Sequence, residues 1–327
     1  MLNKNSHFLR LHPLHLLYLL LLVALTSCER PADLDLPAGS PQLVVEGYIE
    51  PGLPPIVLLT ESQPVFAPFD AAAVAAAHVG GARVVVSTAG DTSVVLREIN
   101  ADSLPVAIRQ ALAQQAGLVL DSAGRFAVPL RFYSVVPVSG QPGLVGRPGR
   151  TYRLHVQARG QTLTAVTSIP TPVPLDSLYF RPSALLGAGD SLVQLFYRFR
   201  DSDTLGNATR YFTSVNGGPF HPPRLTSVFT DEFVNGRTVD FALDRGRSRL
   251  DPATGARATL FRRGDTVTVR WSAIDQPQYR FWLSYENALN SNGSPLASPA
   301  TLSSNIRGGL GIWGGLGTTY KTVVAPR

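Results

Sequence analysis

Cysteine, lysine and charged residues in general are scarce in this sequence, and each shortage narrows the chemistry open to the protein. Cys28 is the only cysteine among 327 residues, which excludes an internal disulfide and a metal site built from several thiolates. Lys4 and Lys321 are the only lysines, and charged residues make up 16% of the chain, below the roughly one quarter usual in soluble domains. Arginine dominates the basic residues but is scattered along the chain, so we expect no nucleic-acid binding.

The one cysteine ends an N-terminal segment with the layout of a bacterial lipoprotein signal. Two basic residues precede an apolar run at 16–25, and small residues then lead to Cys28. The run has about half of the roughly 20 residues that a membrane-spanning helix requires. We therefore interpret residues 1–27 as a signal peptide, Cys28 as the lipidated residue and residues 28–40 as a tether. An ordinary secretory signal, or a short membrane helix beside a chance cysteine, is the alternative.

Strand-like segments fill much of the chain beyond the tether. Residues 151–158 alternate between apolar and polar side chains, as in an antiparallel strand with one buried face. Comparable segments bounded by turn residues lie at 42–50, 56–60, 83–87, 93–97, 163–169, 193–200, 210–215, 225–229, 238–243, 258–262 and 266–271. The 29 glycines and 26 prolines suit the many turns between such strands.

Helical spacing interrupts this series twice. Apolar residues recur at intervals of three and four residues in 104–116 and again in 276–290. The second segment has an apolar face formed by Tyr279, Trp282 and Leu283, with Glu286 one turn further on. Each segment is long enough for about three turns or more, so we predict two helices among the strands.

A proline-rich segment at 169–174 indicates a domain boundary. We therefore predict a mainly β protein with two domains. The first, at 41–170, is an immunoglobulin- or transthyretin-like sandwich, and the second, at 171–327, is a further β-rich domain with one helix.

Catalytic and metal-binding motifs are incomplete. Beyond the signal peptide only His78, His155 and His221 remain, far apart in the sequence. Residues 189–192 spell the Gly-Asp-Ser-Leu signature of an esterase family, but no remaining histidine has the aspartate three residues earlier that would activate the serine. Residues 201–207 resemble half of a calcium loop, with leucine at the fifth position where an oxygen ligand is needed. We therefore predict no catalytic, cofactor-binding or metal-binding residues.

Seven segments together carry a family resemblance. They are residues 28–29, 33–37, 43–49, 149–154, 165–170, 231–236 and 304–315. The last reads Ser-Asn-Ile-Arg-Gly-Gly-Leu-Gly-Ile-Trp-Gly-Gly and is the most specific of the seven. The chain thereby resembles the Bacteroidota lipoprotein family called domain of unknown function 4249, many members of which have phenylalanine in place of Trp313. The resemblance covers essentially all of the chain after Cys28.

This resemblance implies an outer-membrane lipoprotein, often encoded beside a TonB-dependent receptor, and it carries no catalytic residues to transfer. We therefore expect a non-enzymatic accessory or binding partner of a TonB-dependent transporter, anchored through Cys28, without a cofactor. The acidic residues Glu29, Asp33 and Asp35 are interrupted, which leaves both the periplasmic and the cell-surface face of the membrane open. The alternatives are a surface hydrolase of glycan or peptide, since sequence spacing cannot exclude a spatial pair of carboxylates, and a structural or adhesive envelope protein.

Overall fold

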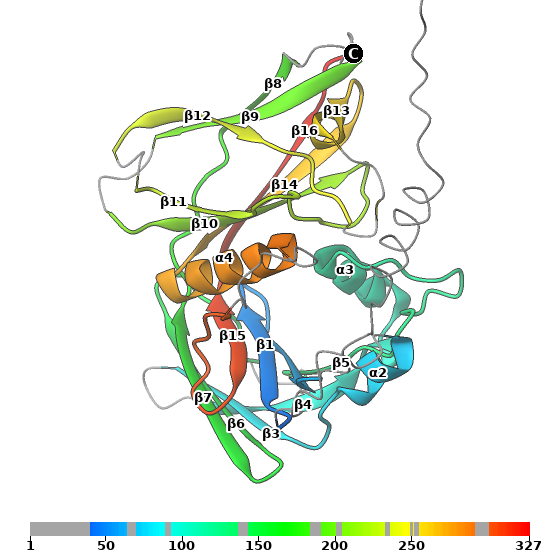
Figure 1. Cartoon of the computed structure of the whole chain (residues 1–327), viewed down its shortest axis with the longest axis vertical. Coiled ribbons are helices and arrows are strands. Elements are labelled where there is room, and N and C mark those ends of the chain that lie inside the picture. Colours follow the sequence, from blue (N-terminus) through cyan, green and yellow to red (C-terminus); the bar gives the residue numbers. More distant parts are fainter. Residues whose placement is uncertain are drawn as a thin grey trace, which may run out of the picture. The chain divides into compact units, whose positions relative to one another are not determined.

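The computed structural model describes residues 40–63, 70–88, 93–136, 143–183, 191–200, 205–232, 236–248, 251, 255–291 and 301–327. Within these ranges, Pro41–Arg327 form one compact unit in which strands predominate (Figure 1). The predicted mainly β fold is therefore confirmed. The predicted signal peptide and Cys28 lie outside the described residues, as does all of the predicted tether except Ser40.

The first sheet has eight strands and includes the chain's penultimate strand. Its order is β15 (Leu310–Gly315), β1 (Leu43–Ile49), β2 (Ile56–Glu61), β5 (Arg131–Ser134), β4 (Ser93–Asn100), β3 (Arg83–Thr88), β6 (Thr151–Ala158) and β7 (Gln161–Ser168). Neighbours are antiparallel except for β15, which runs parallel to β1. The edge strands β7 and β15 approach each other, and the Gly315 N–H donates to Thr167 Oγ1 at 2.8 Å. The sheet is therefore strongly curved and nearly closed.

Trp313 fills the centre of this curved sheet. Its side chain is completely buried, and its Nε1 donates a hydrogen bond of 3.1 Å to the carbonyl of Tyr152. Gly47 lies opposite Trp313 in the β1–β15 register, and a Cβ at Gly47 would lie 2.8 Å from the indole. Close packing of Trp313 against β1 thus requires glycine at position 47.

Two further sheets pack face to face as a β-sandwich. One has the order β11 (Val228–Thr230), β10 (Ala208–Val215), β14 (Thr266–Ile274) and β16 (Gly317–Val324). The other consists of β12 (Thr238–Leu243), β9 (Leu192–Arg200), β13 (Phe261–Arg262) and β8 (Ser177–Pro182). The core between them is aromatic: the Trp271 ring lies 4.8 Å from that of Tyr197 and 6.0 Å from that of Tyr211.

The helices match the predicted ones in part. The helices α3 (Val106–Ala116) and α4 (Gln276–Ser291) confirm the two predicted segments. The short helix α2 (Ala71–Ala76) was not predicted, because its alanines and single valine give no apolar stripe; Asp70 caps its start, accepting from the Ala73 N–H at 2.8 Å. None of the described helices combines the length and apolar character needed to cross a membrane.

Two predicted strands are shorter in the structure. The segment predicted at 258–262 contains the 3₁₀ helix η2 (Ala256–Thr259) before β13, and β11 covers only the end of the segment predicted at 225–229. In the first case Leu260 and Phe261 are both buried. Two successive buried side chains do not fit a strand with one buried face, in which neighbouring residues point to opposite sides.

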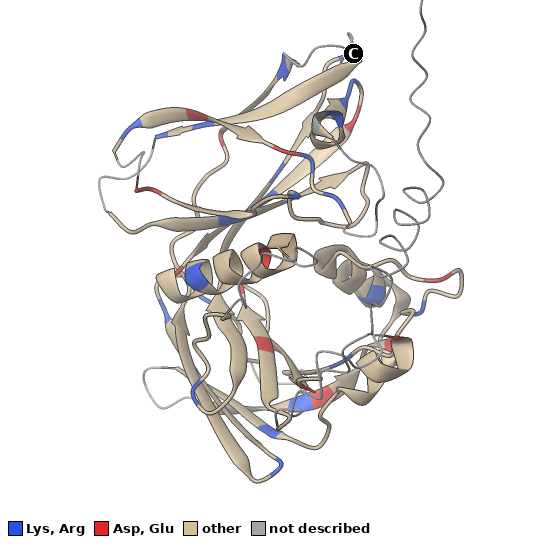
Figure 2. Ribbon diagram, in the orientation of Figure 1, with Lys and Arg blue, Asp and Glu red and all other residues tan. Residues whose placement is uncertain are grey.

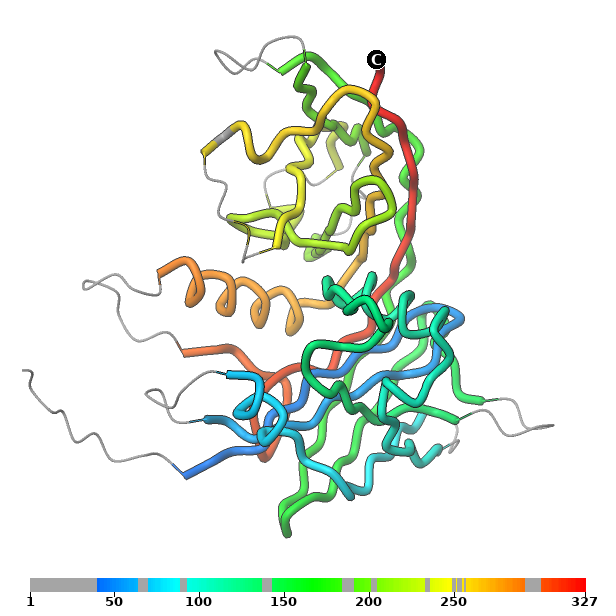
Figure 3. Tube along the Cα trace, turned by 90° about the vertical axis from the view of Figure 1, so that its right-hand side faces the viewer, coloured from blue at the N-terminus to red at the C-terminus, as the bar shows by residue number. Residues whose placement is uncertain are grey.

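The helix α4 lies between the curved sheet and the sandwich (Figures 1 and 3). It contacts β10 and β11 on one side and β15 on the other. Tyr279, Trp282 and Leu283 pack with Leu316, which joins β15 to β16, so the predicted apolar face of this helix is confirmed. Because β15 belongs to the curved sheet and β16 to the sandwich, the last two strands connect the two halves.

Candidate functional site

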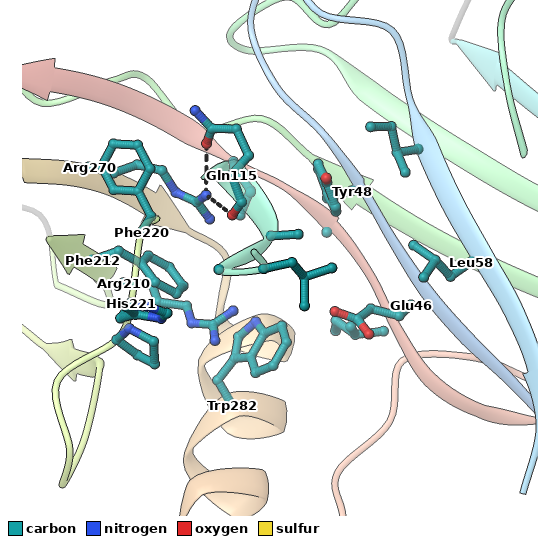
Figure 4. A pocket seen from close by; sticks show the side chains of 18 of the residues that line it. Glu46, Tyr48, Leu58, Gln115, Arg210, Phe212, Phe220, His221, Arg270 and Trp282 are labelled. Carbon is teal, nitrogen blue, oxygen red and sulfur yellow. Dashed lines mark hydrogen bonds between the residues drawn. The ribbon is translucent and has the colours of Figure 1, made fainter. Parts of the chain in front are cut away.

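A cavity of about 450 Å³ lies between the curved sheet, α3, α4 and the sheet that contains β10 and β14 (Figure 4). Strand alternation decides which side chains face it. On β10, Arg210 and Phe212 point toward the cavity while Tyr211 belongs to the sandwich core. On β14, Arg270 faces the cavity and its neighbour Trp271 the core. Two arginines thus enter one cavity from adjacent strands.

Arg270 is fixed at the end of the cavity nearest to α3. Its Nη1 donates to the carbonyl oxygen of Gln115 at 3.1 Å and to the Oε1 of the same residue at 3.0 Å (Figure 4). Its guanidinium carbon lies 4.2 Å from the Phe212 ring centre and 6.0 Å from that of Phe220. The side chain is therefore held by an amide and by aromatic faces, both of which bind guanidinium groups well.

Arg210 lies beside it, over the indole of α4. Its guanidinium carbon is 3.3 Å from the Trp282 ring centre and 4.6 Å from that of Phe212. Its Nε donates to Ser227 Oγ at 3.1 Å. Burial lowers the pKa of Arg210 to about 9, Arg270 adds to this effect and Glu286 opposes it. The guanidinium remains protonated at neutral pH.

Glu286 of α4 anchors this arrangement. It is 3% exposed, and its carboxylate accepts from the Ser227 N–H at 2.8 Å and from Ser227 Oγ at 2.5 Å. Ser227 in turn accepts from Arg210, so one serine joins the carboxylate to the guanidinium. The helical spacing in the sequence predicts that Glu286 lies one turn beyond the apolar face. Its partner Ser227 lies 59 residues away, so no local pattern predicts their contact.

Glu46 of β1 faces Arg210 from the opposite wall (Figure 4). Its side chain is exposed and lines the cavity. Burial raises the pKa of Glu46 above its usual value, and the positive charge of Arg210 partly opposes that rise. A carboxyl group with a raised pKa and a guanidinium group thus line one cavity.

The same space also borders a small network around Tyr320 on β16. The Tyr320 hydroxyl lies 3.1 Å from Gln115 Oε1 and 3.5 Å from a carboxylate oxygen of Glu50. Burial raises the pKa of Tyr320 to about 12, so its hydroxyl keeps its proton in the physiological range. The network holds Gln115, and through it Arg270, in place.

Apolar side chains form the remaining wall. They come from β2, α3, β5 and the residue before β5, and include Ile56, Leu58, Leu112, Leu130 and Phe132. The cavity is therefore amphipathic, with Arg210 and Arg270 on the sandwich side, Glu46 on β1, and hydrocarbon along β2, α3 and β5. Elsewhere basic residues are spread over strands, helices and loops of both halves (Figure 2).

The residues considered from sequence do not come together at this cavity. Cys28 lies outside the described residues. His155 lies on β6, whereas His78 contacts Glu98 at 3.1 Å on the curved sheet. Only His221 lines the cavity, and burial lowers its pKa. Among the residues that the structure describes, no group of three or more histidine, cysteine, aspartate or glutamate side chains is arranged to hold a metal ion.

The two motif-like segments have structural roles where they are described. Ser191 directly precedes β9, while Gly189 and Asp190 lie outside the described residues. Of the calcium-like segment, residues 201–204 also lie outside them. The backbone N–H groups of Gly206 and Asn207 each donate to the Asp231 carboxylate at 3.0 Å, an ordinary closure of a turn.

Sequence reasoning missed the arginine pair, although a signal for it exists. Arg270 lies in β14 between Val269 and Trp271, both almost fully buried, and is itself 8% exposed. Successive side chains of a strand point to opposite faces of the sheet. A single arginine between two buried apolar residues therefore indicates that the second face of this strand borders a different, more polar environment. Without the fold, however, nothing shows which residues form the opposite wall.

Comparison with known proteins agrees with the resemblance seen in the sequence. No curated protein matches the chain significantly. A family model described as "Domain of unknown function (DUF4249)" matches residues 29–322, which include every described strand except the last two residues of β16. The chain belongs to this family.

Proposed function

We propose that the protein is a lipid-anchored outer-membrane lipoprotein that binds a small ligand in this cavity and serves as a non-enzymatic accessory of a TonB-dependent transporter. The observation that carries the proposal is the cavity of about 450 Å³ with Arg210 and Glu46 on opposite walls. Concave, mostly apolar pockets with a few placed polar groups are typical small-molecule sites.

The fixed geometry of the charged groups favours binding. Gln115 holds Arg270, and Ser227 holds Glu286 through both of its hydrogen-bonding atoms. Groups held in place before a ligand arrives lose little side-chain freedom on binding. Such preorganisation favours a site that recognises one class of molecule.

The anchor follows from the N-terminal segment. Diacylglycerol on Cys28 supplies two acyl chains, and two chains give stable membrane attachment where one gives only marginal attachment. A tether of residues 28–40 would then connect the membrane to the folded unit that starts at Pro41. A binding protein held in this way suits delivery of a ligand to a neighbouring transporter.

Affinity purification tests the partnership. The full-length protein, carrying a C-terminal tag, is purified in mild detergent from its native membranes, and the Cys28→Ser variant serves as the unanchored control. We expect a TonB-dependent receptor to be recovered with the anchored protein and to be depleted with the control. Repeated failure to recover any such receptor with the anchored protein would overturn the partnership.

A hydrolase is the second candidate, and one observation favours it. Glu46, with its raised pKa, and Glu286 border the same cavity, and paired carboxylates can act as acid and base in glycoside hydrolysis. Against this, the Glu286 carboxylate already accepts two hydrogen bonds from Ser227. The test is turnover of cell-surface glycans and peptides by the wild type and by Glu46→Gln. Turnover that is lost in the variant would establish the hydrolase, and a wild type without turnover would dismiss it.

A further inference from the structure

An arginine without a counter-ion marks one end of the cavity. Arg270 is 8% exposed, and its Nε has no hydrogen-bond partner within the described part of the chain. The ion pairs formed among those residues include neither Arg270 nor Arg210. An uncompensated buried charge is expensive, and proteins normally place an opposite charge beside it. An anion is therefore the partner that this end of the cavity lacks.

The neighbouring acidic groups are engaged elsewhere. Glu286 binds Ser227, and Glu50 reaches Arg270 only through Tyr320 and Gln115. Glu46 lies across the cavity and faces Arg210 (Figure 4). The two guanidinium carbons meanwhile lie 4.2 Å and 4.6 Å from the centre of the same Phe212 ring, so that two positive charges stand close together. A negative group beside Arg270 would relieve their repulsion as well.

Another part of the cavity wall has the chemistry of a hydrocarbon site. Leu58 and Phe132 line the cavity from β2 and β5, and Leu112 lines it from α3. These residues are partly or fully buried in a common apolar cluster. An apolar group of a ligand would gain by leaving water there, at roughly 25 cal/mol for each Å² buried.

We infer that the cavity binds an amphipathic molecule with one anionic head group, a carboxylate or a phosphate. The head group contacts Arg270, and the hydrocarbon part lies against Leu58 and Phe132. The inference rests on the proposed binding function and specifies its ligand class. The cavity volume of about 450 Å³ suits such a molecule, since ligand pockets span about 300–1,000 Å³.

Calorimetric titration tests this inference. The chain from residue 28 onward is used with Cys28→Ser, so that no attached acyl chain competes for the cavity. The probes are decanoate, decyl phosphate and the neutral decanol, each below the concentration at which it aggregates. We expect at least one anionic probe to bind more tightly than decanol, and the better of the two identifies the head group as carboxylate or phosphate. Equal affinity for all three probes, or no binding of either anion, would overturn the inference.

Variants locate the site. Arg270→Gln should lower the affinity for the tighter-binding anion by about tenfold or more, as expected for loss of a charged hydrogen bond. The affinity for decanol should not change. The matched control is Arg181→Gln, because Arg181 also stacks on two rings, those of Tyr179 and Phe196, but lies half exposed outside the cavity. Undiminished anion binding by Arg270→Gln would contradict the inference.

A second substitution keeps the test decisive if Arg270→Gln does not fold. Leu58→Trp fills the apolar end of the cavity and leaves Arg270 in place. It should lower the affinity for decanoate and for decyl phosphate. Unchanged affinity for both in this variant would place the binding elsewhere and overturn the inference. Failure of these titrations leaves the recovery of a receptor from membranes unaffected, so the ligand class and the partnership are tested separately.

Discussion

Partly buried polar side chains in this protein find partners in other elements of the fold. Glu98 on β4 is an example: its carboxylate accepts from the Gly81 N–H at 2.9 Å and contacts His78 at 3.1 Å and Arg131 at 3.4 Å. The Gly81 hydrogen bond, followed by the contacts with His78 and Arg131, lowers the pKa of Glu98 below its ordinary value of 4.5. The ionised carboxylate thereby stabilises the curved sheet.

Stability should depend on pH through Glu98. A carboxyl group with a lowered folded-state pKa contributes stability that is complete above its unfolded pKa and lost as the pH falls through the folded value. We expect the free energy of unfolding to decline below about pH 4.5, and to decline less steeply in Glu98→Gln. Urea denaturation at a series of pH values measures this. The exposed Glu232→Gln controls for the loss of one acidic group, and identical acid slopes for wild type and Glu98→Gln would contradict the prediction.

The arginine pair shows what sequence reveals at the residue scale. The strand around Arg270 was predicted, and an arginine between two apolar residues could have been recognised as facing a different environment from theirs. Its contact with Gln115, 155 residues away, depends on how α3 packs against the sandwich. Local pattern thus indicates that such a residue is unusual, whereas only the packed structure identifies its neighbours.

At the scale of elements, the predictions that succeeded were those for segments with regular spacing of apolar residues. The helices α3 and α4 and the strand β6 have regular apolar spacing and were predicted close to their observed ends. The short helix α2 has no apolar stripe and was not recognised, and the 3₁₀ turn before β13 overlaps the strand predicted at 258–262. The parallel pairing of β15 with β1 joins residues more than 250 positions apart, and no local pattern encodes such pairing.

The attachment of α4 to the sandwich depends on Glu286. In Glu286→Gln, the amide oxygen can accept only part of what the carboxylate accepts from Ser227, and Arg210 loses a nearby negative charge. We expect the free energy of unfolding to fall by about 1–3 kcal/mol, as for other buried polar groups that lose a partner. Chemical denaturation measures the change, with Glu232→Gln as the exposed control. A stability equal to that of the wild type would show that this contact does not anchor the helix.

At the scale of the whole molecule, the last two strands tie the curved sheet to the sandwich. β15 completes the first sheet with Trp313 in its core, and β16 pairs with β14 in the other half. Leu316 alone separates them. The proline-rich segment predicts a boundary near residue 170. That boundary falls between two halves that the consecutive strands β15 and β16 connect.

This connection predicts cooperative unfolding. Residues 41–327 should unfold in a single thermal transition, followed by circular dichroism and by tryptophan fluorescence. The fragment 41–170 lacks Trp313 and the β15 edge of the curved sheet, so we expect it not to fold alone. As a control, a peptide of residues 301–315 is added to the fragment 41–170 to supply the missing strand β15. Two separate transitions in the long chain, or a stable fragment 41–170, would contradict the prediction.

Attachment to the outer membrane through Cys28 is the claim on which the proposed function depends, and fractionation of cells tests it most directly. Wild type and Cys28→Ser are expressed in the native host, the outer membrane is separated from soluble fractions, and the mass of the mature N-terminus is measured. We predict that the wild type is found in the outer membrane with an acylated Cys28 at its N-terminus, and that Cys28→Ser is soluble or incompletely processed. A Cys28→Ser protein that matures and sediments with the outer membrane as the wild type does would contradict the account.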